Sequence, residues 1–201
     1  MKKLLLIFIT LTMSVMVIAQ EKSKQKEVGL VFNSLNSFGL TYKTGTTKSL
    51  WRFNTLFISG NSTEEVSDSI NRKQSNMGFS IKFGKEYRKL IVDDLEFRYG
   101  VDLAFAYSQY TYNTNDRSIA DNDNTNEKTS YTPGINLVFG LNYIFNDHFV
   151  IGAELLPYFN YTVGKSKITS FRTDDVTESD ISGFSYGLNS TSVMLSLVYR
   201  F

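Results

Sequence analysis

The sequence predicts an all-β protein that forms a closed, antiparallel, up-and-down barrel of eight strands and spans a membrane. Three observations support this prediction. Apolar and polar residues alternate with a period of two, the polar segments between them are alternately long and short, and the chain starts like an exported protein. A length of 201 residues suits one domain with a sizeable core.

The N-terminus has the features of a secretory signal peptide. Two lysines follow Met1, and residues 4–19 carry no charge. These sixteen residues fall short of the roughly 20 that a membrane-spanning helix needs. Small residues near Ala19 fit a cleavage site. We therefore expect a signal peptide over 1–19 and a barrel domain over 20–201.

Strand-like alternation is clearest over 95–107, where apolar or aromatic residues occupy seven successive odd positions. The same pattern recurs over 77–83, 135–145 and 193–201. Pro157 cannot donate a ladder hydrogen bond, so we expect a kink or bulge there. We break the first apolar segment at residues 34–36. The expected strands lie near 27–33, 37–44, 49–60, 76–87, 95–112, 131–146, 148–165 and 184–201.

The connections between these strands differ in length according to the end of the barrel. The long ones are rich in Asn, Asp, Ser and Thr and span 61–75, 113–130 and 166–183. The short ones span 44–48, 87–94 and 146–148. Because long and short connections alternate, we expect long loops at the outer end and short turns at the periplasmic end.

The polar residues between the apolar ones indicate which face meets lipid. Even-numbered glycines share the charged face of several strands, as expected for a narrow interior that side chains fill. The opposite orientation, with apolar residues inside, would give a soluble lipocalin-like barrel. The charged residues expected inside are Lys43, Arg52, Lys82, Glu86, Glu96, Arg98, Asp102, Glu154 and Arg200.

These five cations and four anions nearly balance. Because an unpaired buried charge costs several kcal/mol, we expect them to pair across the lumen and close it. We expect one aromatic girdle at Tyr42, Trp51, Phe83, Tyr143, Phe145, Phe149, Tyr199 and Phe201, and an opposite one at Tyr107, Phe159 and Tyr161.

The C-terminal segment ends in Phe201, preceded at alternate positions by Tyr199, Leu197, Leu195 and Val193. It resembles the signal that the barrel-assembly machinery reads in bacterial outer-membrane proteins. The chain is therefore similar to small Bacteroidota-type outer-membrane β-barrels, with an architecture like that of the OmpA-type and OmpX-type barrels. The resemblance implies residence in the cell outer membrane of a Gram-negative bacterium, contact with lipid and lipopolysaccharide, and insertion by that machinery.

The sequence offers little for catalysis or cofactor binding. It has no cysteine, and its single histidine, His148, lies in a predicted periplasmic turn. The segment 121–127 has alternate oxygen ligands but lacks the glycine of a calcium loop. A net charge of +1 argues against nucleic-acid binding. We therefore expect no enzymatic activity, no cofactor and no metal.

The expected role is structural, surface-interacting or envelope-maintaining, performed by a barrel with a closed lumen. A narrow channel for small solutes is the second interpretation, and the soluble ligand-binding barrel is the third. The sequence does not identify a surface partner.

Overall fold

The computed structural model describes residues 25–34, 37–68, 70–116, 123–146, 148–170, 173 and 175–201. For 55–59 and 116 it describes the backbone only. The predicted signal peptide lies outside the described residues. The strands are β1 (Gln25–Ser34), β2 (Ser37–Thr46), β3 (Ser49–Val66), β4 (Ile70–Val92), β5 (Leu95–Asp116), β6 (Asn124–Ile144), β7 (Phe149–Leu155), β8 (Tyr158–Ser170), β9 (Asp175–Gly187) and β10 (Val193–Arg200).

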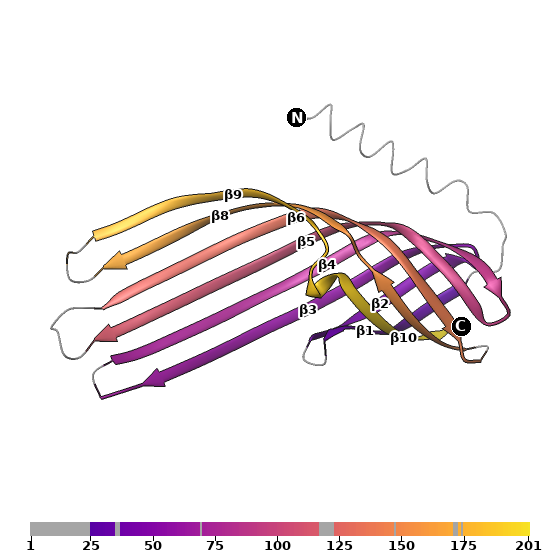
Figure 1. The fold of residues 1–201 in the computed structure, drawn as a ribbon, viewed down its shortest axis with the longest axis horizontal. Helices are drawn as coiled ribbons and strands as arrows, with labels where there is room; N and C mark the ends of the chain where they lie inside the picture. The colour runs from indigo at the N-terminus through magenta and orange to yellow at the C-terminus, as the bar shows by residue number, and fades with distance from the viewer. Residues whose placement is uncertain are drawn as a thin grey trace, which may run out of the picture.

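Eight of these strands close into a ring. Each strand from β1 to β6 pairs antiparallel with the next, β7 pairs with β10, and β10 pairs with β1. β8 and β9 continue β7 and β10 beyond two interruptions (Figure 1). The prediction of an eight-stranded, up-and-down antiparallel barrel is therefore confirmed. Within the described residues, no helix is long and apolar enough to cross a bilayer.

The two interruptions lie side by side. Pro157 separates β7 from β8, as the sequence predicts, and a short 3-10 helix, η2 (Ser190–Ser192), separates β9 from β10. The amide of Leu156 donates to the carbonyl of Ser192 at 2.7 Å. The expectation of one unbroken strand over 184–201 is therefore wrong. Its cause is local, because the Asn189 side chain accepts from the amide of Thr191 and starts the helical turn.

The prediction of long loops over 61–75, 113–130 and 166–183 is also wrong. Strands extend into each of these segments, and β3, β4, β5, β6, β8 and β9 continue past the ring as long hairpins (Figure 1). Opposite charges face each other across them, such as Lys73 with Glu64 and Lys167 with Glu178. Because both faces of these hairpins are polar, the alternation that indicates a strand is absent from their sequence.

Beyond the ring, the hairpins form an open, curved sheet in the order β3, β4, β5, β6, β8, β9. β9 pairs only with β8, and residues 57–66 of β3 pair only with β4. The β1–β2 hairpin is much shorter, since Ser34 already pairs with Ser37 at its tip. The barrel therefore has one tall wall and one short wall.

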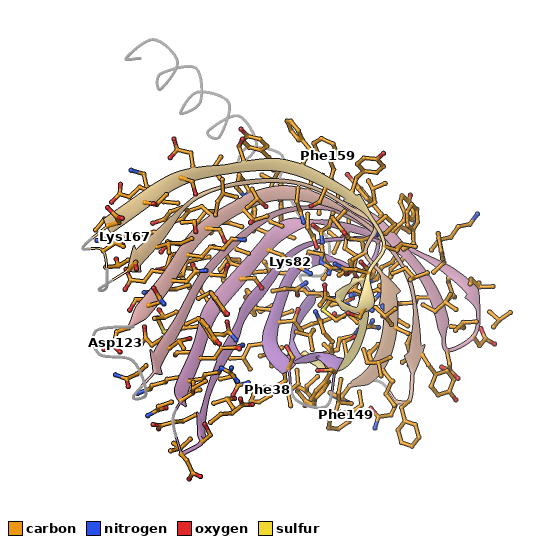
Figure 2. The ribbon with its side chains drawn as sticks, turned by 60° about the vertical axis from the view of Figure 1, so that its left-hand side comes forward. Phe38, Lys82, Asp123, Phe149, Phe159 and Lys167 are labelled. Atoms are coloured by element: carbon orange, nitrogen blue, oxygen red, sulfur yellow. The ribbon has the colours of Figure 1, made fainter. Side chains whose placement is uncertain are left out.

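Apolar side chains point away from the barrel axis. Leu103 is 63% exposed, Phe139 44% and Leu197 45%, and Phe38, Phe149 and Phe159 project outward in Figure 2. Charged side chains lie on the opposite face of the same strands, where Asp102 and Glu154 are buried. This orientation excludes the lipocalin-like alternative and provides the apolar outer belt of a membrane barrel.

Aromatic residues gather at both ends of this belt. At the end with short turns, Trp51 stacks on Phe83 with ring centroids 5.4 Å apart, and the Lys85 ammonium lies 4.5 Å from the centroid of the Trp51 ring. At the other end, Tyr107 packs against Tyr131, and Tyr161 packs against Phe184. These two groups have the positions of interfacial girdles.

Candidate functional site

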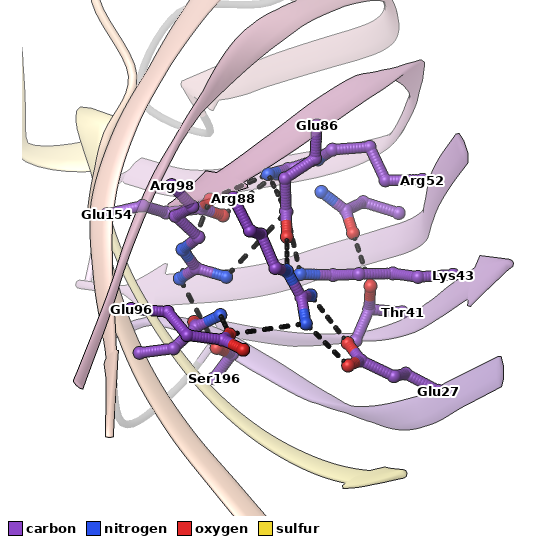
Figure 3. A network of polar contacts seen from close by, with 12 residues as sticks. Glu27, Thr41, Lys43, Arg52, Glu86, Arg88, Glu96, Arg98, Glu154 and Ser196 are labelled. Atoms are coloured by element: carbon purple, nitrogen blue, oxygen red, sulfur yellow. Dashed lines mark hydrogen bonds and ion pairs between the residues drawn. The ribbon is translucent and has the colours of Figure 1, made fainter. Parts of the chain in front are cut away.

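The lumen holds the charged residues that the sequence singles out. Seven of the nine are buried, and Lys82 and Arg200 are partly buried. They come from β2, β3, β4, β5, β7 and β10, so their contacts cross the interior from wall to wall (Figure 3). We call the luminal charge network the set Glu27, Lys43, Arg52, Glu86, Arg88, Glu96, Arg98, Asp102, Glu154 and Arg200.

Arg52 is the centre of this network. Its Nη1 and Nη2 donate to Glu154 Oε2 and Oε1 at 2.8 and 2.9 Å, a two-point contact with β7 across the lumen. Nη1 also donates to Glu86 Oε2 at 3.1 Å, and Nε lies 3.2 Å from Asp102 Oδ1. Lys43 donates to the same Glu86 oxygen at 2.8 Å. One guanidinium thus joins three carboxylates from three strands.

A second group of charges lies next to it, toward the short turns. Arg88 contacts both carboxylate oxygens of Glu27 at 2.7 Å and reaches Glu86 at 2.6 Å, which connects the two groups. Arg200 donates to Glu27 at 3.0 Å and to Glu96 at 3.2 Å. The interactions join β1, β4, β5 and β10.

Two members of the network, Glu27 and Arg88, are not among the residues expected from the sequence. Both lie at the ends of expected strands, Glu27 next to a polar lead-in and Arg88 one residue beyond 76–87. Arg88 keeps the even parity of Lys82 and Glu86, which is the signal that could have identified it. Glu27 alternates with the outward-facing Val28, but a ten-residue strand offers a weak pattern.

Two glycines make room for Arg98. A Cβ atom at Gly140 would lie 2.8 Å from Arg98 Nε, and one at Gly152 would lie 2.6 Å from Arg98 Nη2. At Gly152 the added atom would also meet Ser196 Oγ and Asn142 Oδ1. These even-numbered glycines therefore let the arginine lie flat against the wall of the barrel, in a space that any side chain would fill.

An apolar layer lies farther along the lumen, toward the long hairpins. Val31, Val138, Leu156 and Met194 form one buried cluster, contributed by β1, β6, the Pro157 interruption and β10. Beyond this layer is a cavity of about 330 Å³ that opens toward the hairpins. Leu156 belongs to both, so this layer forms part of the floor of the cavity.

The remaining candidates do not form a site. His148 stacks on Tyr199, an outward-facing residue of β10, with ring centroids 5.4 Å apart at the short-turn end. Residues 121 and 122 of the calcium-like segment lie outside the described residues. Among those described, no group of His, Asp or Glu could hold a metal ion.

Comparison with known families decides the affiliation of this barrel. Residues 64–188 match the OmpA-OmpF-like porin family, which is more than half of the chain. The chain belongs to this family. Together with the outward apolar belt, this membership makes the protein an integral β-barrel of the bacterial outer membrane. None of the curated protein sequences matches the chain.

Solved structures of outer-membrane proteins are similar to this member of the OmpA-OmpF-like porin family. A major outer membrane protein from Thermus thermophilus has a TM-score of 0.54 at 10% identity, over 90% of this chain and 100% of its own. At this low sequence identity, the similarity shows that the two proteins share a fold. CarO of Acinetobacter baumannii has a TM-score of 0.38 at 10% identity, over 89% and 95% of the chains. Ail, the attachment invasion locus protein of Yersinia pestis, has a TM-score of 0.35 at 17% identity, over 90% and 100%.

In this porin-family barrel the first and last strands close the ring. The amide of Lys26 donates to the carbonyl of Phe201 at 3.0 Å, and the amide of Phe201 donates back at 2.9 Å. All five alternate residues of the C-terminal segment point outward and are exposed, namely Val193, Leu195, Leu197, Tyr199 and Phe201. The last side chains of the chain therefore lie on the lipid-facing surface of the closing strand.

Proposed function

We propose that this protein is a non-conducting, non-enzymatic outer-membrane barrel that acts through its surface, in binding partners or in maintaining the envelope. The observation that carries the proposal is the luminal charge network, in which Arg52 joins Glu86, Asp102 and Glu154 from three strands. Guanidinium and carboxylate groups occupy the lumen from wall to wall, and a buried apolar layer lies beyond them.

Opening a water-filled path through this lumen would require breaking several buried contacts at once. Removing one partner of a buried ion pair leaves an uncompensated charge, which costs about 3–5 kcal/mol. Each of Glu27, Glu86 and Glu154 contacts at least two cations, so displacing a single side chain does not free its partner. This connectivity favours a permanently closed lumen over a gated one.

The tall wall supplies the surface for interaction. With the long hairpins outside the cell, their polar faces contact lipopolysaccharide sugars, neighbouring envelope proteins or molecules from the surroundings. The apolar belt contacts outer-membrane lipid. The role needs no cofactor and no catalytic group.

Because the family is named for porins, conduction through a narrow channel is the alternative, and planar-bilayer recording separates the two. We expect the wild-type protein to show no stable single-channel current. The double variant Arg98→Ala, Glu154→Ala removes one cation and one anion, opens space beside Arg52 and should create brief, small currents. A stable conductance in the wild-type protein would refute the closed lumen.

A matched pair outside the lumen controls this experiment. Arg72 and Glu65 face each other on the exposed sheet at 4.0 Å, so Arg72→Ala with Glu65→Ala also removes one cation and one anion. We expect these changes to leave the recordings like those of the wild type. Currents in this control would mean that the hairpins, and not the network, set the permeability.

We also propose that the C-terminal segment is recognised by the barrel-assembly machinery through its outward-facing side chains. Phe201 contributes main-chain hydrogen bonds to Lys26 through its backbone, while its exposed side chain is available to be bound before insertion. Replacing Phe201 with Ala keeps the backbone bonds and removes only the side chain.

We expect Phe201→Ala to refold in detergent as well as the wild type but to reach the outer membrane of cells at a much lower level. The measurement is heat-modifiability on gels, both for refolded protein and for membrane fractions. The control is Leu103→Ala, which removes an exposed apolar side chain from the middle of the belt. Equal insertion of Phe201→Ala and the wild type in cells would argue against recognition at this residue.

A further inference from the structure

The cavity above the apolar layer has the construction of a binding site for a small molecule. Its volume of about 330 Å³ falls at the lower end of the range for small-molecule pockets, about 300–1,000 Å³. The tall wall, the β1–β2 hairpin, the Pro157 interruption and η2 all contribute to its lining. It is therefore enclosed from several sides and below, and open toward the long hairpins.

The lining of the cavity combines apolar surface with small hydrogen-bonding groups. Amides and hydroxyls reach it from β1, β4, β5, β6, β8 and the segment of η2, and they belong to Asn33, Ser80, Ser108, Thr132, Asn136, Asn160, Asn189 and Thr191. Several of these groups are already hydrogen-bonded within the wall, since Ser108 pairs with Ser130, Thr132 with Thr162 and Thr191 with Asn189. Hydroxyl and amide groups can still donate or accept further hydrogen bonds. A ligand with several hydroxyls can use this remaining capacity, whereas an apolar ligand cannot. Tyr158 adds an aromatic ring to the lining.

Lys82 gives the cavity a positive charge. It is the only charged side chain among the described lining residues, and Figure 2 shows it inside the barrel. It interacts electrostatically with Asp102 and Glu154, which Arg52 also engages through its guanidinium. Among the residues that the structure describes, the luminal charge network and Lys82 together comprise six cations and five anions. The excess is one positive charge.

We propose that this cavity binds one acidic monosaccharide unit, with its carboxylate toward Lys82 and its hydroxyls on the amide and hydroxyl lining. The size of the cavity suits one sugar ring, and a single carboxylate balances the one excess positive charge. This ligand class deepens the proposed surface role, and it rests on that role only in placing the cavity mouth outside the cell. If the barrel conducted ions, the proposal of a closed lumen would be wrong, and the binding of the sugar would still be decided by its own test.

Glucuronate and glucose test this proposal, because they differ at one position, a carboxylate in place of a hydroxymethyl group. We expect isothermal titration of the refolded barrel in detergent to show glucuronate binding at least about tenfold more tightly than glucose, as for a hydrogen bond between charged groups. Methyl glucuronide distinguishes a free sugar from the end of a glycan, because its anomeric oxygen is substituted as in a glycan. Binding equal to that of glucuronate would support the proposal for a glycan end, and weaker binding would support it for the free sugar.

Two variants address the two halves of the site. Lys82→Gln should remove most of the preference for glucuronate while leaving weak glucose binding. Ala106→Leu should fill the cavity and weaken both sugars about tenfold or more, without changing any charge. The matched controls are Lys73→Gln, an exposed lysine on the outer side of β4, and Ala153→Leu on the lipid-facing side of β7. Both should bind like the wild type.

Three outcomes would overturn the proposal. They are equal affinity of the wild type for the two sugars, unchanged glucuronate binding in Ala106→Leu, and no glucuronate binding at millimolar concentration by a barrel that shows heat-modifiability. If Lys82→Gln does not assemble, Ala106→Leu and the sugar pair still decide the question.

Discussion

Replacing Arg52 with Ala should destabilise the barrel more than any other single change considered, by about 3–5 kcal/mol, or should prevent folding. The guanidinium contacts Glu86, Asp102 and Glu154, all of them buried. Its removal would take away the guanidinium 3.2 Å from Asp102, and it would leave Glu86 with Lys43, Arg88 and Arg98, and Glu154 with Arg98. The remaining network would then hold four cations and five anions, in a space that water reaches poorly. Both the unbalanced carboxylate charge and its desolvation would then oppose folding.

Urea unfolding in micelles measures this effect, with the fluorescence of Trp51, the only tryptophan of the chain, as the signal. Removing Glu154 as well should recover part of the lost stability, because the numbers of cations and anions in the network are then equal again. The control is Arg72→Ala on the exposed sheet, where an ion pair contributes about 0–1 kcal/mol. If Arg52→Ala were no less stable than Arg72→Ala, Arg52 would not hold the network together.

Replacing Gly152 with Val should cause the second largest loss, about 2–3 kcal/mol, through overpacking. Even a Cβ atom at this position would lie 2.6 Å from Arg98 Nη2 and 2.8 Å from Asn142 Oδ1. The arginine would have to leave its place beside Glu154 and Ser196, which it contacts at 3.6 and 3.5 Å. The damage thus reaches the charge network through a residue that carries no charge.

The same urea titration, together with the temperature at which the folded gel band disappears, tests this expectation. Ala153→Val is the matched control, since Ala153 is the next residue of β7 and faces lipid. It should leave the stability of the barrel close to that of the wild type. Equal stability of the two variants would mean that Arg98 can repack without cost.

The transmembrane half of the fold could be predicted because alternation carries both strand position and side-chain orientation. Asp102 beside Leu103 already separates lumen from lipid, and the structure has this arrangement. The Pro157 interruption could be predicted for a similarly local reason, the missing backbone donor. The register of the barrel, in contrast, depends on pairings between distant parts of the chain.

The half beyond the ring could not be predicted in the same way. Both faces of the hairpins are polar and exposed to solvent, so no apolar stripe distinguishes a strand from a loop over 166–183. η2 depends on side-chain capping by Asn189, which in the sequence looks the same as any polar loop residue. The pairing of the charges could not be predicted either, because Arg52 and Glu154 are 102 residues apart and meet only when the ring closes.

The open sheet has two uncovered borders, and both carry only acidic charges. β9 contains Asp175, Glu178 and Asp180 without any basic residue, and residues 57–66 of β3 contain Glu64 and Glu65 likewise. When two molecules approach border to border in a crowded membrane, carboxylates meet carboxylates, and the strands repel each other before their backbones can pair. We therefore expect the tall walls of neighbouring copies to stay separate at high density and to remain accessible to molecules of a different kind.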